Sequence, residues 1–250
     1  MKAAGYIARA TLRQLLGVRR LILFGTLVLL PTLLLLVQGG DPGPRDLLRE
    51  YVDVSTGSFF LVALPITALI LSASALGSER ADHTLSFLVL RPIPRWSIAV
   101  AKLGAAFAAA LLINGFGALV MSAVYGARAS DWAYLGPMLA GTAVATLLYT
   151  AIFVPLGYLT ERSTLIGLAY VFVWEAGIVS GIEALGVTSP WRVGYAAFVA
   201  LAPSEINSIV KDFALADLTP DIGSTVIQVA VFMALSIALV TWLLRTKDLA

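Results

Sequence analysis

The chain lacks cysteine altogether and has one histidine, His83, among its 250 residues. Without cysteine it can form no disulfide, no thiolate metal site and no redox motif. A single histidine offers no H-E-x-x-H zinc motif, and no G-x-S-x-G elbow accompanies it for serine hydrolase chemistry. The sequence therefore predicts no catalytic residue, no metal and no cofactor on this chain.

Charge is also scarce. Only 13% of the residues are charged, whereas soluble domains carry about 25%. The net charge of +2 gives no reason to expect a nucleic-acid partner. A G-x-x-x-x-G-K-[ST] motif is missing, so the chain is not expected to bind ATP through a P-loop.

Apolar residues dominate instead, at 59% of the chain. A chain this apolar cannot cover its surface with polar groups in water. Runs of 20 or more residues that are free of charge, or broken once by Glu175, occur six times. About 20 helical residues cross a bilayer core of about 30 Å, and backbone groups in lipid must pair internally. We therefore predict an all-α membrane protein in one domain, with spans at 21–38, 56–78, 98–125, 132–159, 163–183 and 222–244.

One further apolar run, 193–204, is too short to cross. We interpret it as a re-entrant or surface-lying segment within an extracellular region at 184–221, and Pro203 should end its helix. The aromatic residues near predicted span ends are expected to form interface belts; they are Trp132, Tyr134, Trp191 and Trp242.

The distribution of Lys and Arg predicts the orientation. The N-terminus, 79–102, 161–162 and the C-terminus hold twelve of the 17 basic residues, and the other connections hold five. The positive-inside rule then places both termini in the cytoplasm, which six spans also require. A multi-pass protein of the cytoplasmic membrane, surrounded by lipid, is the expected setting.

Residues 2–19 are predicted to form an amphipathic interfacial helix rather than a signal peptide. Lys2, Tyr6, Arg9, Arg13 and Arg20 follow helical spacing along one face. The apolar residues Ile7, Leu12, Leu15 and Val18 fall toward the other side.

The predicted inner loop 79–97 is the most structured polar stretch. Leu85, Leu88 and Val89 share one face of a short helix that Asp82 or Thr84 can cap and Pro92 ends. Composition alone leaves two interpretations open: a docking helix at the mouth of the bundle, or a segment that rests on the membrane.

The motif in this loop resembles a known family. Glu79-Arg80-x-Asp82-x-Thr84-Leu85, with Leu88 and Arg91-Pro92-Ile93-x-Arg95-Trp96 after it, is similar to the first intracellular loop of ABC-2 type exporter permeases. More narrowly, it resembles the six-span branch that includes the permease of the nitrous oxide reductase maturation transporter. His83 departs from the pattern, because the family usually has glycine there.

The resemblance implies the membrane-spanning permease subunit of an ATP-binding-cassette exporter. Its loop would dock on a separate ATPase as a helix in a groove, and that ATPase would hold ATP and Mg. Two ATPase copies and a second permease, identical or paralogous, would complete the transporter. The implied ATPase-coupling residues are Glu79, Arg80, Asp82, His83, Thr84, Leu85, Leu88, Val89 and Arg91.

Glu175 is interpreted as the only charge inside a span, which makes it a candidate translocation-path residue, together with Asn114. A structural role for the carboxyl group is the alternative. Gly177 and Gly181 form a G-x-x-x-G that fits helix packing, either within the monomer or in a dimer. A competing function is an ion- or proton-coupled carrier that uses Glu175, although the repeated halves typical of carriers are not found. A membrane-embedded enzyme is disfavoured, because paired acids and a second histidine are missing.

Overall fold

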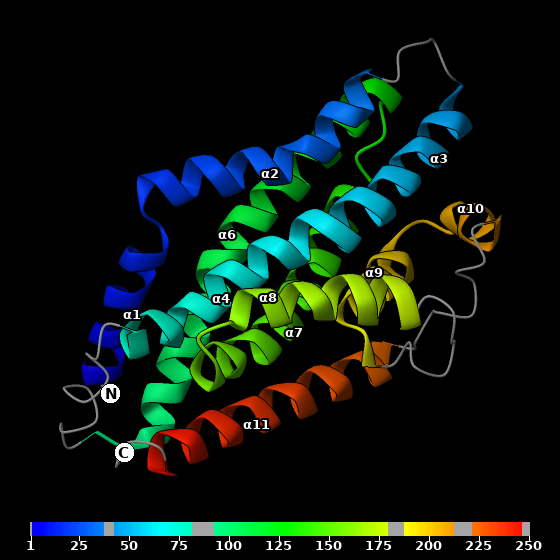
Figure 1. The fold of residues 1–250 in the computed structure, drawn as a ribbon. Helices are drawn as coiled ribbons and strands as arrows, with labels where there is room; N and C mark the ends of the chain where they lie inside the picture. The colour runs from blue at the N-terminus through cyan, green and yellow to red at the C-terminus, as the bar shows by residue number, and fades with distance from the viewer. Residues whose placement is uncertain (1, 38–42, 82–92, 180–187, 213–221, 247–250) are drawn as a thin grey trace.

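Figure 1 shows the fold in a computed structural model, which describes residues 2–37, 43–81, 93–179, 188–212 and 222–246. Within these ranges every regular element is a helix. Five helices are long and apolar enough to cross a membrane, and Ser163–Val179 is a shorter apolar helix. The predicted all-α membrane class is confirmed. Of the fifth predicted span, 163–183, the last four residues lie outside the described ranges.

The chain begins with α1 (Lys2–Leu15) and α2 (Val18–Val37). On α1, Thr11 and Leu15 are buried while Arg9 and Arg13 are exposed, so its predicted amphipathic character is confirmed. The predicted extent was wrong, because the helix ends before Gly17. Glycine loses more freedom in a helix than other residues, which favours a break there. Val18 therefore starts the next helix and is exposed rather than sharing the apolar face.

The next helical run is longer than the predicted span 56–78. It joins α3 (Pro44–Val54), a π-helix η1 (Ser55–Ala63) and α4 (Leu64–Ala81). A search for charge-free apolar runs does not find α3, because this helix contains charged residues. Pro65 is the second residue after the π-helix, and the wider π turns before it accommodate a residue that has no N–H and crowds the preceding turn.

Three helices form the centre of the bundle: α4, α6 (Arg95–Ala129) and α7 (Leu135–Leu159) pack against one another. Helix α1 lies against α6, and α2 also packs on α6. The last helix, α11 (Ile222–Thr246), packs on α6 and α7. Only 17% of its most apolar window is buried, so α11 lies at the periphery of the bundle.

The remaining elements are α8 (Ser163–Ala169), which continues into the π-helix η2 (Tyr170–Val179), α9 (Pro190–Leu201) and α10 (Ile206–Asp212). Ten of the twelve residues of α9 are buried. Its Gly194 crosses α7 at Gly141, where an added Cβ on Gly141 would lie 2.6 Å from the Gly194 carbonyl oxygen. The short predicted segment is thus an inserted helix that packs on α7, not a surface-lying one, and it ends before Pro203 as expected.

The described ends of α1 and α11 lie at the same end of the bundle (Figure 1). We call this the terminal end; the last residues of α4 and α7 and the first residues of α6 and α8 lie there too. The opposite, far end holds α3, α9 and α10.

Candidate functional site

An ion pair ties α4 to α6 at the terminal end. The Lys102 ammonium donates to the Glu79 carboxylate, and the Lys102 side chain is fully buried. Lys102 lies inside the predicted span 98–125, so the interpretation of Glu175 as the only charge inside a span was wrong. The sequence did carry a signal, because a cation next to apolar residues requires a partner and Glu79 is the acid that ends the preceding span.

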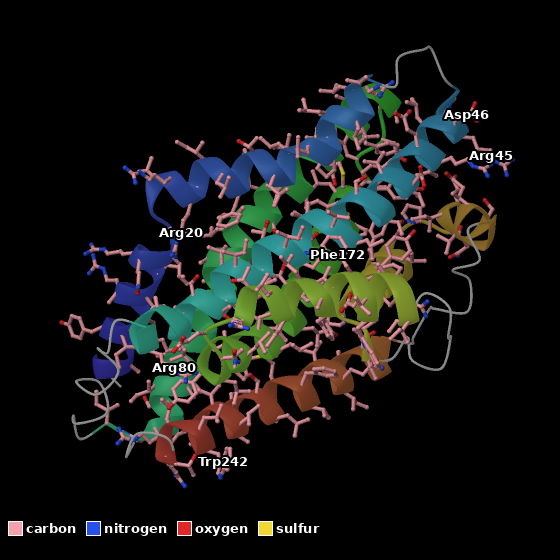
Figure 2. All side chains as sticks on the ribbon, viewed as in Figure 1. Arg20, Arg45, Asp46, Arg80, Phe172 and Trp242 are labelled. Carbon is pink, nitrogen blue, oxygen red and sulfur yellow. The ribbon has the colours of Figure 1, made fainter. Side chains whose placement is uncertain are left out.

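A second contact ties α4 to α7 at the same end. The Arg80 guanidinium donates to the Tyr158 carbonyl oxygen at 2.6 Å, in the last turn of α7. The last carbonyl groups of a helix have no partner within the helix and carry a partial negative charge. A basic side chain therefore donates a hydrogen bond to them and is also attracted by their charge. Figure 2 labels Arg80 at this end of the bundle. Next to it a polar cavity of about 200 Å³ lies between α4, the end of α7 and the start of α8.

Glycine permits this contact. Gly157 of α7 lies so close to α4 that an added Cβ would overlap the Ala73 carbonyl group, and Gly77 faces Gly157 in turn. The backbones of the two helices therefore touch, as small residues allow between membrane helices. The terminal ends of α4, α6 and α7 form one connected unit.

The structure describes two of the nine predicted coupling residues. Glu79 and Arg80 lie in α4 and both bind within the chain. Seven others lie outside the described residues: Asp82, His83, Thr84, Leu85, Leu88, Val89 and Arg91. A docking role for all nine stays a prediction.

Glu175 lies in a buried polar cluster between η2, α7 and the start of α9. Its side chain is fully buried and accepts a hydrogen bond from the Tyr149 hydroxyl. The hydroxyls of Tyr170 and Ser189 and the backbone N–H of Trp191 lie around the same carboxyl group. Tyr170 and Glu175 are five residues apart, a spacing that the wider π turn brings onto one face.

This arrangement places a carboxyl group at the N-terminus of α9. Ser189 precedes the first residue of α9, and Trp191 belongs to its first turn. The first N–H groups of a helix have no partner within the helix and attract an acceptor. The Glu175 carboxyl group therefore lies against the start of the inserted helix, where the hydrogen bond from Tyr149 holds it, and this position agrees with the structural alternative left open by the sequence. A role in translocation stays a prediction.

Asn114 is fully buried between the three central helices. Its side-chain amide donates to the Thr146 hydroxyl at 3.2 Å and approaches the Leu64 carbonyl oxygen at 3.4 Å. The contact joins α6 to α7 and α4 inside one protomer. Its predicted place on a translocation path stays untested.

Gly177 lies on the exposed face of η2. Among the described residues, a Cβ added there would come within 4 Å only of the Phe172 carbonyl oxygen, which belongs to the same helix. Gly177 therefore does not allow a close contact with another described helix of the monomer. Gly181 lies outside the described residues, and dimer packing stays a prediction for the pair.

Aromatic side chains cluster at the far end. Tyr51 stacks on Tyr125 with ring centroids 4.6 Å apart and meets Tyr134 and Phe198 edge-on. The predicted interface belt was wrong for Tyr134 and Trp191, which are 1% and 5% exposed. Tyr134 packs against Tyr51 and Tyr125, and Trp191 belongs to the buried helix α9, which the interface rule does not anticipate. Trp132 and Trp242 are well exposed, as that rule requires.

Composition, helices and buried polar contacts together define a polytopic α-helical membrane protein whose passes are tied into one bundle. The chain belongs to the ABC-2 family of transporter proteins: the family model matches residues 7–249, almost its whole length. No individually curated protein matches the chain. The family confirms the predicted permease class and implies association with an ABC ATPase subunit. The narrower likeness to the nitrous oxide reductase maturation branch stays a prediction.

Proposed function

We propose that this chain is the permease subunit of an ATP-driven exporter whose ATP hydrolysis takes place on a separate subunit. Two permeases and two ATPases would form the complex, with ATP and Mg held by the ATPases. The connected unit at the terminal end is the observation that supports coupling. Residues 82–92 join α4 to α6, and α4 is tied at this end to both α6 and α7.

Force applied to that loop would move three central helices together. A flexible attachment would lose such force locally, whereas a buried ion pair and touching backbones transmit it. A carrier that uses Glu175 is less favoured, because the carboxyl group is engaged at the start of α9.

The test is Leu88→Asp, which places a charge on the apolar stripe of the predicted docking helix. An unpaired charge at a docking anchor typically costs several kcal/mol. The permease should reach the membrane in normal amounts, yet co-purification with its ATPase and ATP-dependent transport should be lost.

Arg91→Ala is the matched control in the same loop. If the loop only rests on lipid, removing this basic anchor should matter more than Leu88→Asp. Full ATP-dependent transport by the Leu88→Asp variant would contradict the proposed coupling.

A further inference from the structure

A groove of about 340 Å³ runs along the surface of α7 between α8–η2 and α11. Its floor is the second half of α7, one wall carries Ile166 and Tyr170, and the other carries Leu235, Ser236 and Leu239. Its walls both pack on α7. The volume lies at the lower end of the range of about 300–1,000 Å³ that ligand sites occupy.

The groove opens to the side of the bundle. Leu159, Ile166, Leu235 and Leu239 line it and are 40%, 48%, 64% and 39% exposed. Because α7 and α11 are membrane-spanning candidates, this rim faces hydrocarbon rather than water. An empty apolar groove forfeits dispersion contacts, so a hydrocarbon chain is the occupant that fits it.

Ser236 adds a polar requirement. It is 4% exposed, and its hydroxyl has no hydrogen-bond partner among the described residues. Serine in a helix commonly donates to the carbonyl four residues earlier, as Ser74 and Ser78 do here. Ser236 does not, although it lines the groove. A buried hydroxyl in a low-dielectric site favours an occupant with an acceptor oxygen.

Basic residues stand at the terminal end of the groove. Arg162 directly precedes α8, Arg245 lies in the last turn of α11, and both are exposed. In the sequence, Glu161 adjoins Arg162, and Lys247 and Asp248 follow Arg245. Figure 2 labels Trp242 on this last part of α11, where an interface aromatic is expected. Cations at this depth attract the phosphate of a lipid whose chain lies in the groove.

We propose that the groove binds one membrane glycerophospholipid. One acyl chain lies along α7, its ester carbonyl accepts a hydrogen bond from Ser236, and its phosphate lies toward Arg162 and Arg245. None of the residues that line the groove belongs to the predicted coupling loop, and the proposal does not rest on the proposed function. The chain would also pack against Tyr170, whose hydroxyl faces Glu175.

The test uses the purified full-length permease in nanodiscs that contain a phosphatidylglycerol with a diazirine on one acyl chain. After irradiation, mass spectrometry should find the label concentrated on 151–159 and 232–239. Ser236→Leu, which fills the groove and removes the hydroxyl, should lower this labelling about tenfold, the equivalent of 1.4 kcal/mol. Ala234→Leu, an exposed position on the same helix, should leave it unchanged.

A second variant separates the hydroxyl from the filling of space. Ser236→Ala should weaken competition by an unlabelled diester lipid but not by a diether lipid of the same chain length. Even labelling of α2, α6 and α11 that Ser236→Leu does not change would overturn the proposal, since ordinary surrounding lipid explains it. Exclusion of the lipid probe from the groove by a second copy of the chain would overturn it as well.

Discussion

Glu175 illustrates how a costly residue can serve the fold. A carboxyl group inside a span is unfavourable unless it has partners, and this one meets donors from α7, η2 and the start of α9. Removing it would leave those donors buried without an acceptor. The residue is therefore expected to act by holding α9 in place.

Glu175→Ala tests this role. An unsatisfied buried polar group costs about 1–3 kcal/mol, which corresponds to roughly 5- to 150-fold in a local opening equilibrium. Amide hydrogen exchange of 190–201 should quicken by about that factor, while α2 stays unchanged. Tyr149→Phe, which removes one donor and leaves the acceptor in place, should have a smaller effect. Unaltered exchange in both variants would leave the anchoring of α9 without support.

At this scale the sequence predicted which residue types were unusual better than it predicted their partners. Glu175 stood out because it interrupts an apolar run. Its donor Tyr149 and the polar groups of residues 170, 189 and 191 around it come from separate elements, and only the fold brings these together. Lys102 was missed because it lies at the edge of a run, although Glu79 could have been suspected as its partner. The interaction of Arg80 with a backbone carbonyl leaves no trace in the sequence.

Helix contacts in this bundle depend on where glycine lies rather than on how many glycines there are. Gly157 lies at a crossing where α7 touches α4, whereas Gly177 lies on an open face of η2. The G-x-x-x-G pattern drew attention to Gly177, but the close helix contact is at Gly157. Spacing alone does not show which face of a helix meets a neighbour.

Matched alanine substitutions test this difference. Gly157→Ala forces the Cβ against the Ala73 carbonyl group and should lower the free energy of unfolding by about 1–3 kcal/mol, as overpacking does. Gly177→Ala should leave the monomer unchanged or stabilise it by up to about 1 kcal/mol through helix propensity. Unfolding in mixed micelles measures both. Equal stability of the two variants would show that α4 and α7 lie farther apart than the approach of Gly157 to the Ala73 carbonyl group indicates.

The sequence predicted some helix boundaries well and missed others. Long apolar runs predicted α2, α6, α7 and α11 closely, because length and hydropathy determine whether a helix can cross. The helix α3 was missed, since its charged residues belong to a segment that continues a span beyond the apolar run. The short run at 193–204 was recognised as too short to cross, but its burial depends on the small residues Gly141 and Gly194 of two distant elements.

At the scale of the whole molecule, parity and charge lead to the same arrangement. An even number of passes puts the chain ends on one side, and the described ends of α1 and α11 do lie together (Figure 1). Most basic residues belong to segments at that terminal end. The positive-inside rule therefore predicts that this end is cytoplasmic and that α9 and α10 lie toward the outside.

Cysteine labelling can test this orientation without a background, because the native chain has no cysteine. Ala10→Cys on α1 and Ser204→Cys after α9 both introduce thiols at exposed positions at opposite ends of the bundle. A membrane-impermeant maleimide should label Ser204→Cys only in right-side-out preparations and Ala10→Cys only in inverted vesicles. Ala106→Cys, at a fully buried position, is the control that should resist labelling in both. If both exposed variants reacted from the same side, the number of passes between residues 10 and 204 would have to be even rather than five. The shorter helix Ser163–Val179 would then be the first candidate for a segment that does not cross.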